Sequence, residues 1–170
     1  MIYAASHYDV FATGITVSQR QAELAGQRIR SAGLEGRCTV RLCDYRDVEE
    51  SESYDKIASI GMFEHVGEHN FPRYFGKIYR ALKPGGWVLN HGITQNLLGA
   101  ESLGSGIGDF VEEYVFPGGQ LVHVSRVIQG MASEGLEVID AEGVNSLNLL
   151  NPFDASPEEA DSWARQLNLI

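Results

Sequence analysis

The sequence predicts an α/β protein: an open, mostly parallel, doubly wound sheet with helices on both of its faces. Apolar segments with strand character alternate with helical segments at the spacing of strand-helix-strand units. Chemically mixed segments follow several of these strands, at the edge where such sheets bind ligands. The chain has 170 residues, 44% of them hydrophobic, so it is long enough to bury one compact core.

The first half is predicted to contain two strands joined by a helix. Residues 10–17 form the first strand. The helix starts at Ser18, because Ser18 and Gln21 have the spacing of a capping box, and it ends at Gly33. The second strand covers residues 38–42, and the polar run at 44–47 closes it.

The second half is predicted to continue this alternation. The apolar run at residues 57–60 is typical of a strand buried on both faces. A helix starts near Asn70 and ends at the Lys-Pro-Gly-Gly run of residues 83–86. The remaining expected elements are a strand at 87–93, a helix at 122–133, a strand near 137–141 and a short helix from Ser156 through Trp163.

The acidic net charge of the chain excludes some classes of binding partner. The chain carries 13 basic and 23 acidic residues, and from Pro84 onward there are only 2 basic residues against 12 acidic ones. A net charge of −10 has the wrong sign for a protein that binds phosphates, so nucleic acid is not expected as a partner. The acidic half is also not expected to dock on an anionic bilayer.

Compartment and cysteine chemistry follow from the same composition. No apolar run reaches the roughly 18 residues of a membrane helix, and the first ten residues lack the layout of a signal peptide. We therefore expect a cytoplasmic protein. Cys38 and Cys43 are an odd number of residues apart in one strand, which predicts two buried thiols on opposite faces and neither a disulfide nor a metal pair.

Two strand ends in the first half carry candidate binding residues. Asp44 can accept a hydrogen bond from a nucleotide, and Tyr45 can lie against an aromatic base. An ordinary acidic turn explains Asp44 equally well. Gln21 is also ambiguous, and its helix-capping role is the safer local interpretation.

Two strand ends in the second half carry candidate catalytic residues. Glu64 follows one strand and His91 ends the next, so a carboxylate and an imidazole can hold or relay a proton at one edge of the sheet. The alternative for His91 is a hydrogen-bonded core histidine. No metal-ligand spacing is present. The glycine-rich run at residues 104–108 lacks a strong strand before it, and we interpret it as a mobile loop over the site.

Several motifs together resemble one enzyme family. The run SIGMFEHVG at residues 59–67 is close to the signature of the cyclopropane-fatty-acyl-phospholipid synthase family of S-adenosylmethionine-dependent methyltransferases. The runs TGITVS with Gln21 at 13–21, DYRD at 44–47, LKPGG at 82–86 and YVFPGG at 114–119 are similar to other segments of that family. The resemblance covers residues 1–143 as a partial methyltransferase domain, and residues 144–170 form a tail outside it.

The resemblance implies a Rossmann-like fold of the class I methyltransferase type. It implies methyl transfer from S-adenosylmethionine to a cis double bond of a phospholipid acyl chain, through a carbocation that closes a cyclopropane ring, with peripheral membrane contact. Bound bicarbonate would take the released proton, held by Glu64, His91 and the backbone at Ile93. The implied cofactor-binding residues are Thr16, Ser18, Gln21, Asp44, Tyr45, Arg46, Ile60 and Gly61.

The chain also departs from the family pattern. The family's first strand and its acidic-Gly-x-Gly-x-Gly turn would precede residue 1, and residues 143–149 contain no tyrosine where the family has one in the bicarbonate site. We therefore expect weak activity, and a homo-oligomer or a strand-exchanged dimer that covers unpaired strand edges. Two alternatives stay open: a non-catalytic relative that serves as a binding module, and a methyltransferase for a small soluble acceptor.

Overall fold

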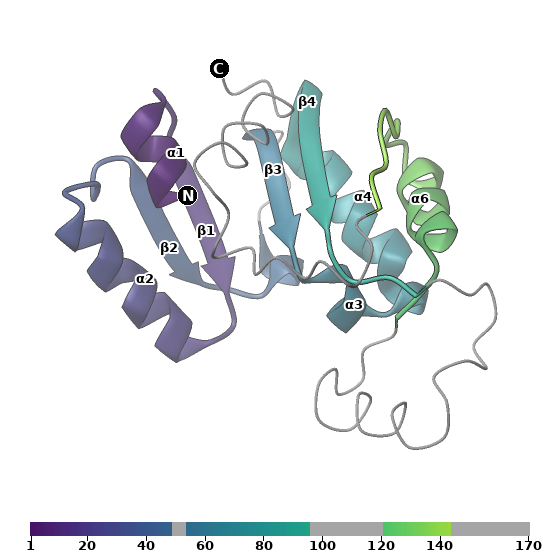
Figure 1. Ribbon diagram of the computed structural model, residues 1–170, viewed down its shortest axis with the longest axis horizontal. Helices are drawn as coiled ribbons and strands as arrows, with labels where there is room; N and C mark the ends of the chain where they lie inside the picture. The colour runs from purple at the N-terminus through teal and green to yellow at the C-terminus, as the bar shows by residue number, and fades with distance from the viewer. Residues whose placement is uncertain (49–53, 96–120, 144–170) are drawn as a thin grey trace. The chain divides into compact units, whose positions relative to one another are not determined.

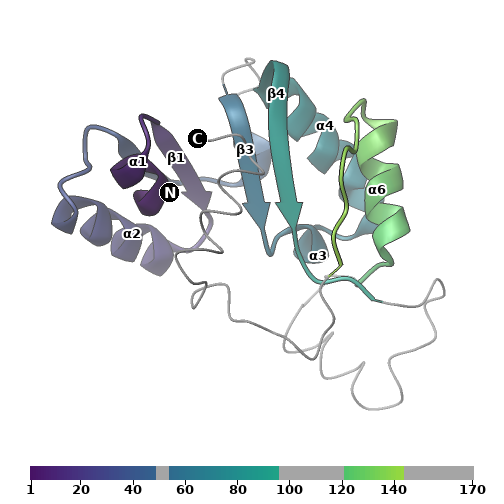
Figure 2. The same ribbon diagram turned by 45° about the horizontal axis from the view of Figure 1, so that its top comes forward.

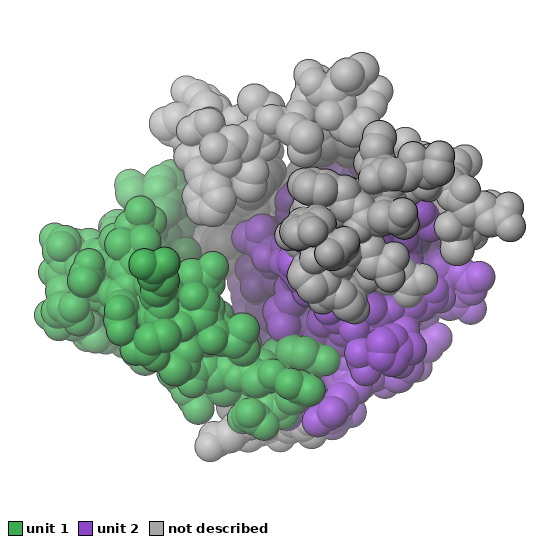
Figure 3. Space-filling model, turned by 90° about the horizontal axis from the view of Figure 1, so that it is seen from below, with its two compact units in different colours: residues 1–49, 155–170 green, residues 50–154 purple. Residues whose placement is uncertain are grey.

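The computed structural model describes residues 1–48, 54–95 and 121–143 (Figure 1). The chain divides into two compact units (Figure 3). The first unit is described over residues 1–48, and the second over residues 54–95 and 121–143. In the described part of each unit, two strands that follow one another along the chain pair in parallel.

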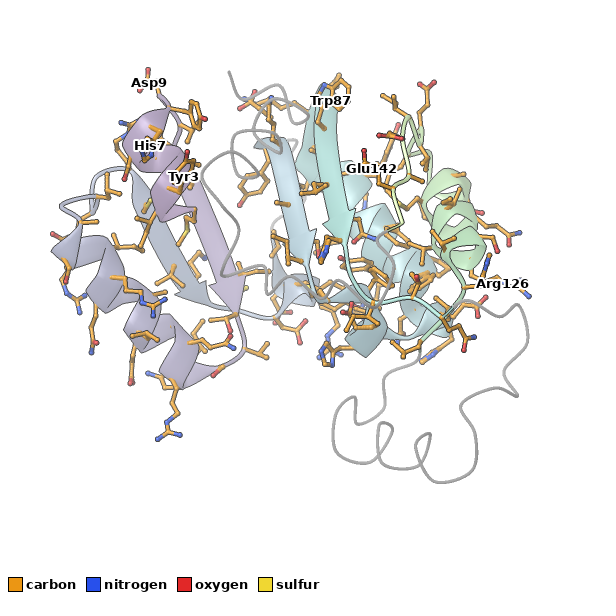
Figure 4. The ribbon with its side chains drawn as sticks, viewed as in Figure 1. Tyr3, His7, Asp9, Trp87, Arg126 and Glu142 are labelled. Carbon is orange, nitrogen blue, oxygen red and sulfur yellow. The ribbon has the colours of Figure 1, made fainter. Side chains whose placement is uncertain are left out.

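The first unit has helices packed on one face of its strand pair. Its elements are α1 (Ile2–His7), β1 (Ala12–Thr16), α2 (Gln19–Ser31), β2 (Cys38–Leu42) and the 3₁₀ turn η1 (Tyr45–Asp47). Strands β1 and β2 pair in parallel from Ala12 opposite Cys38 to Thr16 opposite Leu42. Ala5, Ile29 and Cys38 form the buried centre of this unit. Tyr3 and His7, both labelled in Figure 4, stack on α1 with ring centroids 4.2 Å apart.

The ends of α2 confirm the local predictions. The Ser18 side chain caps the helix by accepting a hydrogen bond from the Gln21 amide at 3.3 Å. Gly33 adopts a φ of +67°, and the Leu34 amide donates back to the Ile29 carbonyl at 3.1 Å, which closes the last turn.

The opposite face of the first strand pair is exposed among the described residues. Phe11 is 82% exposed and Val17 is 73% exposed, on either side of β1. Within the first unit, helices therefore cover one face of this pair. Cys38 is buried as predicted; Cys43 is only half-buried and lies just past β2, and both are free thiols.

The second unit contains a longer parallel strand pair (Figure 2). Its elements are β3 (Tyr54–Ile60), α3 (Phe63–Val66), the 3₁₀ turn η2 (Glu68–Asn70), α4 (Phe71–Ala81), β4 (Leu82–His91) and α6 (Val124–Ser133). The pairing runs from Ile57 opposite Val88 to Ile60 opposite His91. The register shifts near the start, because Tyr54 pairs with Leu82 but Lys56 pairs with Trp87, and the residues between bulge out.

Aromatic packing forms the core of the second unit. Helix α4 buries Phe71, Tyr74, Phe75 and Ile78, and Phe71 and Phe75 meet edge to face with centroids 5.2 Å apart. Helix α6 packs against α4 through Gly130, where an added Cβ would stand 3.0 Å from the Phe71 ring. The close approach of the two helices therefore depends on a residue without a side chain.

Two predictions for the second unit are wrong. Residues 57–60 are buried on one face only, because Ser59 faces the core while Ala58 and Ile60 are exposed. Residues 137–141 form no strand; Leu136 is buried, but the segment after it has no pairing partner among the described residues. The predictions for residues 104–108 and 156–163 lie outside the described residues. None of the helices in the described ranges is long and apolar enough to span a bilayer.

Candidate active site

Glu64 lies buried at the carboxyl end of β3. Gly61 turns the chain with a φ of +63°, and the short helix α3 then places Phe63 and Glu64 in the core, each 2% exposed. Glu64 Oε1 accepts a hydrogen bond from the Ile93 amide at 3.3 Å, which is long for this kind of bond. Glu64 Oε2 is buried and has no hydrogen-bond partner among the described residues.

The backbone at Gly92 lies directly against this carboxylate. A Cβ built on Gly92 would stand 2.5 Å from Glu64 Oε2 and would overlap the Phe63 ring. Glycine at this position therefore allows β4 and the segment beyond it to approach Glu64 closely. Gly92 was not among the predicted site residues; the sequence signal for it is a residue without a side chain between His91 and Ile93, where the strand ends.

Burial without full hydrogen bonding makes the Glu64 carboxylate costly to the fold. A buried ionised group is normally paired or fully hydrogen-bonded, and leaving one polar atom without a partner costs about 1–3 kcal/mol. Glu64 has one long bond and one unpartnered oxygen. This oxygen can accept a hydrogen bond from a small molecule that carries an O–H or N–H group.

His91 ends β4 at the same edge of the second strand pair. It lies opposite Ile60, and its carbonyl accepts a hydrogen bond from the Gly61 amide at 2.9 Å. The residue is exposed, so the alternative of a core histidine is wrong. Glu64, His91 and Ile93 are thus brought to the carboxyl edge of β3 and β4, with the carboxylate buried and the imidazole residue exposed.

Thr16, Ser18 and Gln21 form a hydrogen-bonded group at the carboxyl end of β1. The Thr16 hydroxyl donates to Gln21 Oε1 at 2.7 Å and accepts from the Ser18 amide at 3.1 Å. The Gln21 amide completes the helix cap on Ser18. Capping therefore accounts for the Gln21 backbone, while its side chain binds Thr16 and stays exposed at the strand end.

Asp44 and Arg46 form a bidentate pair at the carboxyl end of β2. Arg46 Nε donates to Asp44 Oδ1 at 2.9 Å and Arg46 Nη2 donates to Oδ2 at 2.6 Å, while the Arg46 amide also donates to Oδ1. The hydrogen bond to Asp44 and the charge of that carboxylate raise the pKa of Arg46 above its usual value. The turn is therefore satisfied locally, and Tyr45 lies half-buried within it.

Strand register brings these two groups of the first unit to one edge. Thr16 lies opposite Leu42, and the Cys43 amide donates to the Thr16 carbonyl at 2.9 Å. A ligand at this edge meets hydroxyl, amide, carboxylate and guanidinium groups together. In the described parts of the chain, no three His, Cys, Asp or Glu side chains gather as metal ligands do.

Comparison with known proteins gives a consistent set of relatives. Residues 1–148 match the family described as mycolic acid cyclopropane synthetase. A probable fatty acid methyltransferase from Pseudomonas putida is 41% identical over 142 residues, which cover 84% of this chain and 36% of that protein. The cyclopropane-fatty-acyl-phospholipid synthase of Escherichia coli K12 is 39% identical over 127 residues, 75% of this chain and 30% of that enzyme. The chain spans about a third of the length of these curated relatives.

Solved structures show the same relationship. The cyclopropane synthase MmaA2 from Mycobacterium tuberculosis superposes with a TM-score of 0.72 at 27% identity, covering 81% of this chain and 50% of that one. The mycolic acid cyclopropane synthase CmaA1, complexed with SAH and CTAB, gives a TM-score of 0.70 at 29% identity, covering 82% and 51%.

These comparisons decide the fold class and the family. The predicted Rossmann-like α/β fold of the class I methyltransferase type is confirmed. The family match ends at residue 148, and the boundary placed at residue 143 stays a prediction. Because the match covers most of the 170 residues, the chain belongs to the mycolic acid cyclopropane synthetase family.

Proposed function

We propose that this chain carries out S-adenosylmethionine-dependent methyl transfer to the cis double bond of a phospholipid acyl chain, with closure of a cyclopropane ring. Family membership supports the reaction class. The Escherichia coli relative, a cyclopropane-fatty-acyl-phospholipid synthase, supports the substrate class. The single observation that carries the proposal is the buried Glu64 carboxylate with an unpartnered oxygen at the strand edge.

The residues present fit the cofactor that this reaction needs. The half-buried Thr16 and the exposed Gln21 offer hydroxyl and amide groups to the polar part of a nucleoside, and Tyr45 with Arg46 offers a ring and a planar cation to its base. When bound, S-adenosylmethionine supplies an electrophilic methyl group. The family resemblance assigns these residues to the cofactor, and they stay proposed contacts: Thr16, Ser18, Gln21, Asp44, Tyr45, Arg46, Ile60 and Gly61.

Glu64 is proposed to stabilise the positive charge that forms on the acyl chain and to help remove the proton that ring closure releases. Methyl addition to a double bond leaves positive charge on the acyl chain, and ring closure releases one proton. A fixed carboxylate in a buried setting stabilises that positive charge. Glu64 Oε2 can also accept the O–H of a bicarbonate ion, whose remaining oxygens would then take the released proton. His91 and the backbone at Ile93 are proposed to hold the same bicarbonate ion.

Replacing Glu64 tests the proposal. The chain is incubated with methyl-labelled S-adenosylmethionine and vesicles of phospholipid with cis-unsaturated acyl chains, and cyclopropane fatty esters are measured by mass spectrometry. Glu64→Gln is expected to lower the rate by at least about 100-fold and to leave cofactor binding near normal. Glu68→Gln is the matched control, because Glu68 lies four residues away and its carboxylate makes a long surface pair with Arg126 at 3.7 Å.

Other outcomes separate the alternatives. Equal activity in Glu64→Gln and wild type removes Glu64 from the mechanism. Calorimetric titration with S-adenosylmethionine and S-adenosylhomocysteine that shows no binding favours a non-catalytic relative. The expected low rate and the expected homo-oligomer stay predictions, which the same assay and sedimentation of the purified chain measure.

A further inference from the structure

A buried polar network lies one residue before the strand ends of the second unit. Ser59 on β3 and Asn90 on β4 are register partners. The Tyr74 hydroxyl, from α4, lies 2.5 Å from Ser59 Oγ and donates to Asn90 Oδ1 at 3.3 Å. Tyr74 is 2% exposed and Ser59 is 9% exposed, while Asn90 is half-buried with its Nδ2 atom shielded from solvent.

Burying these polar groups in the core costs stability. The surroundings are apolar, since the Tyr74 ring lies 4.9 Å from that of Phe75. Asn90 Nδ2 is buried with no hydrogen-bond partner in the described part of the chain. A partly satisfied polar network is less favourable than apolar packing of the same shape, so stability alone does not explain these three side chains.

The network joins the two segments that meet at Glu64. Tyr74 belongs to α4, which continues the stretch that begins with Glu64 on α3 and passes through η2. Asn90 immediately precedes His91, Gly92 and Ile93, and the Ile93 amide is the group that donates to Glu64. Two hydrogen bonds therefore connect the segment that runs from Glu64 to α4 with the end of β4. One is made by Tyr74 to Asn90, and the other by the Ile93 amide to Glu64.

We infer that Ser59, Tyr74 and Asn90 form a positioning network, which fixes the end of β4 and holds the Ile93 amide against Glu64. Its effect on activity rests on the proposed function. Its effect on the Ile93 amide does not, because that hydrogen bond exists without turnover. Misplacement of reacting groups by about 1 Å lowers rates by about 100-fold, so a network of this kind acts on the rate more than on substrate binding.

Tyr74→Phe tests the inference, because it keeps the ring and removes only the hydroxyl. Hydrogen exchange at the Ile93 amide, followed by NMR, is expected to become about 10-fold faster or more, while amides of the β3–β4 ladder such as Leu89, which faces β3 as His91 does, keep their rates. The kcat of methyl transfer is expected to fall by about 10- to 100-fold, with KM for S-adenosylmethionine unchanged. Tyr79→Phe is the matched control: Tyr79 is on the same helix and 51% exposed, so neither quantity should change.

A fully apolar variant separates positioning from stability. Ser59→Ala, Tyr74→Phe and Asn90→Leu together remove every polar group of the network and are expected to restore the melting temperature lost in Tyr74→Phe. Ile93 exchange and kcat should stay impaired. If both recover with the melting temperature, the network is merely structural and the inference is overturned.

The exchange measurement decides the inference even without activity. Unchanged Ile93 exchange in Tyr74→Phe overturns it whatever the rates are. If the wild-type chain transfers no methyl group, the proposed function fails, but faster Ile93 exchange in the variants still supports the network.

Discussion

The two strand pairs end in polar groups of similar kinds, but these groups differ in how well they are satisfied. In the first unit, Thr16 and Gln21 bond to each other, and Asp44 bonds to Arg46 through both carboxylate oxygens. In the second unit, Glu64 is buried with one long hydrogen bond and one unpartnered oxygen. Locally satisfied groups need no ligand to explain them, whereas a buried unpaired oxygen does.

Because of this difference, a ligand has to meet different requirements at the two strand edges. A ligand at the first edge has to replace bonds that already exist between exposed side chains, which costs little because water can take part in the exchange. A ligand at the second edge completes a bond that the fold leaves open. The second edge therefore has an unsatisfied hydrogen-bond acceptor before any ligand binds, whereas the polar groups of the first edge are already paired with each other.

The largest expected effect on stability comes from removing the charge of Glu64. Glu64→Gln should raise the free energy of unfolding by about 1–3 kcal/mol, because a neutral amide costs less to bury than a carboxylate with one bond. Urea denaturation measures the change. Asp44→Asn is the comparison in the first unit and should lower stability slightly, since it breaks a satisfied pair. Changes of the same sign in both variants would contradict the contrast between the two edges.

A smaller effect is expected from Thr16→Val, which keeps the shape of the side chain and removes its hydroxyl. The variant leaves Gln21 Oε1 and the Ser18 amide to solvent, so the free energy of unfolding should fall by about 0.5–1.5 kcal/mol. Calorimetry should also show about 10-fold weaker binding of S-adenosylhomocysteine, in line with the loss of about one hydrogen bond. Thr13→Val, on the exposed face of β1, is the control. Equal binding in both variants would remove Thr16 from the proposed cofactor contacts.

The smallest effect is expected at the opposite end of the second strand pair and depends on pH. The hydrogen bond from Lys83, at 2.8 Å, lowers the pKa of Asp55 below its ordinary value of 3.8. The stabilisation is therefore present above pH 3.8 and is lost as pH falls through the lowered pKa. Melting temperatures of wild type and Asp55→Asn should differ slightly at pH 7, and the difference should shrink as pH falls below 3.8. A difference that persists in acid would show that the charge pair is not its source.

Local chemistry explains which parts of the fold the sequence predicts. The cap at Ser18, the stop at Gly33 and the start of α4 near Asn70 depend on residues a few positions apart, and the structure confirms them. Helix α4 ends at Ala81, before the predicted stop at residues 83–86, and that run belongs to β4, which begins earlier than the strand predicted at 87–93. The strand expected at 137–141 fails because a short run with apolar, β-branched residues forms a strand only where a partner strand is available. Burial of residues 57–60 on both faces fails for a similar reason, since it depends on segments distant in sequence.

In the candidate site, too, the features that depend on distant parts of the chain could not be predicted. The positions of Glu64 and His91 at strand ends follow from the order of elements and could be predicted. The burial of one and the exposure of the other could not, because they depend on how Gly92 and Phe63 pack around the carboxylate. The network of Ser59, Tyr74 and Asn90 joins three elements and leaves no local pattern in the sequence.

The bulge at the start of β4 has a consequence for protein engineering. Lys83, Pro84 and Gly85 are exposed and lie outside the regular pairing, between Leu82 and Trp87. The strand from Trp87 to His91 separates them from the candidate site by about 13–17 Å at about 3.3 Å per residue. Extra residues or a fluorescent label inserted at this tip extend a segment that already bulges, so they leave the strand register and the Glu64 environment intact.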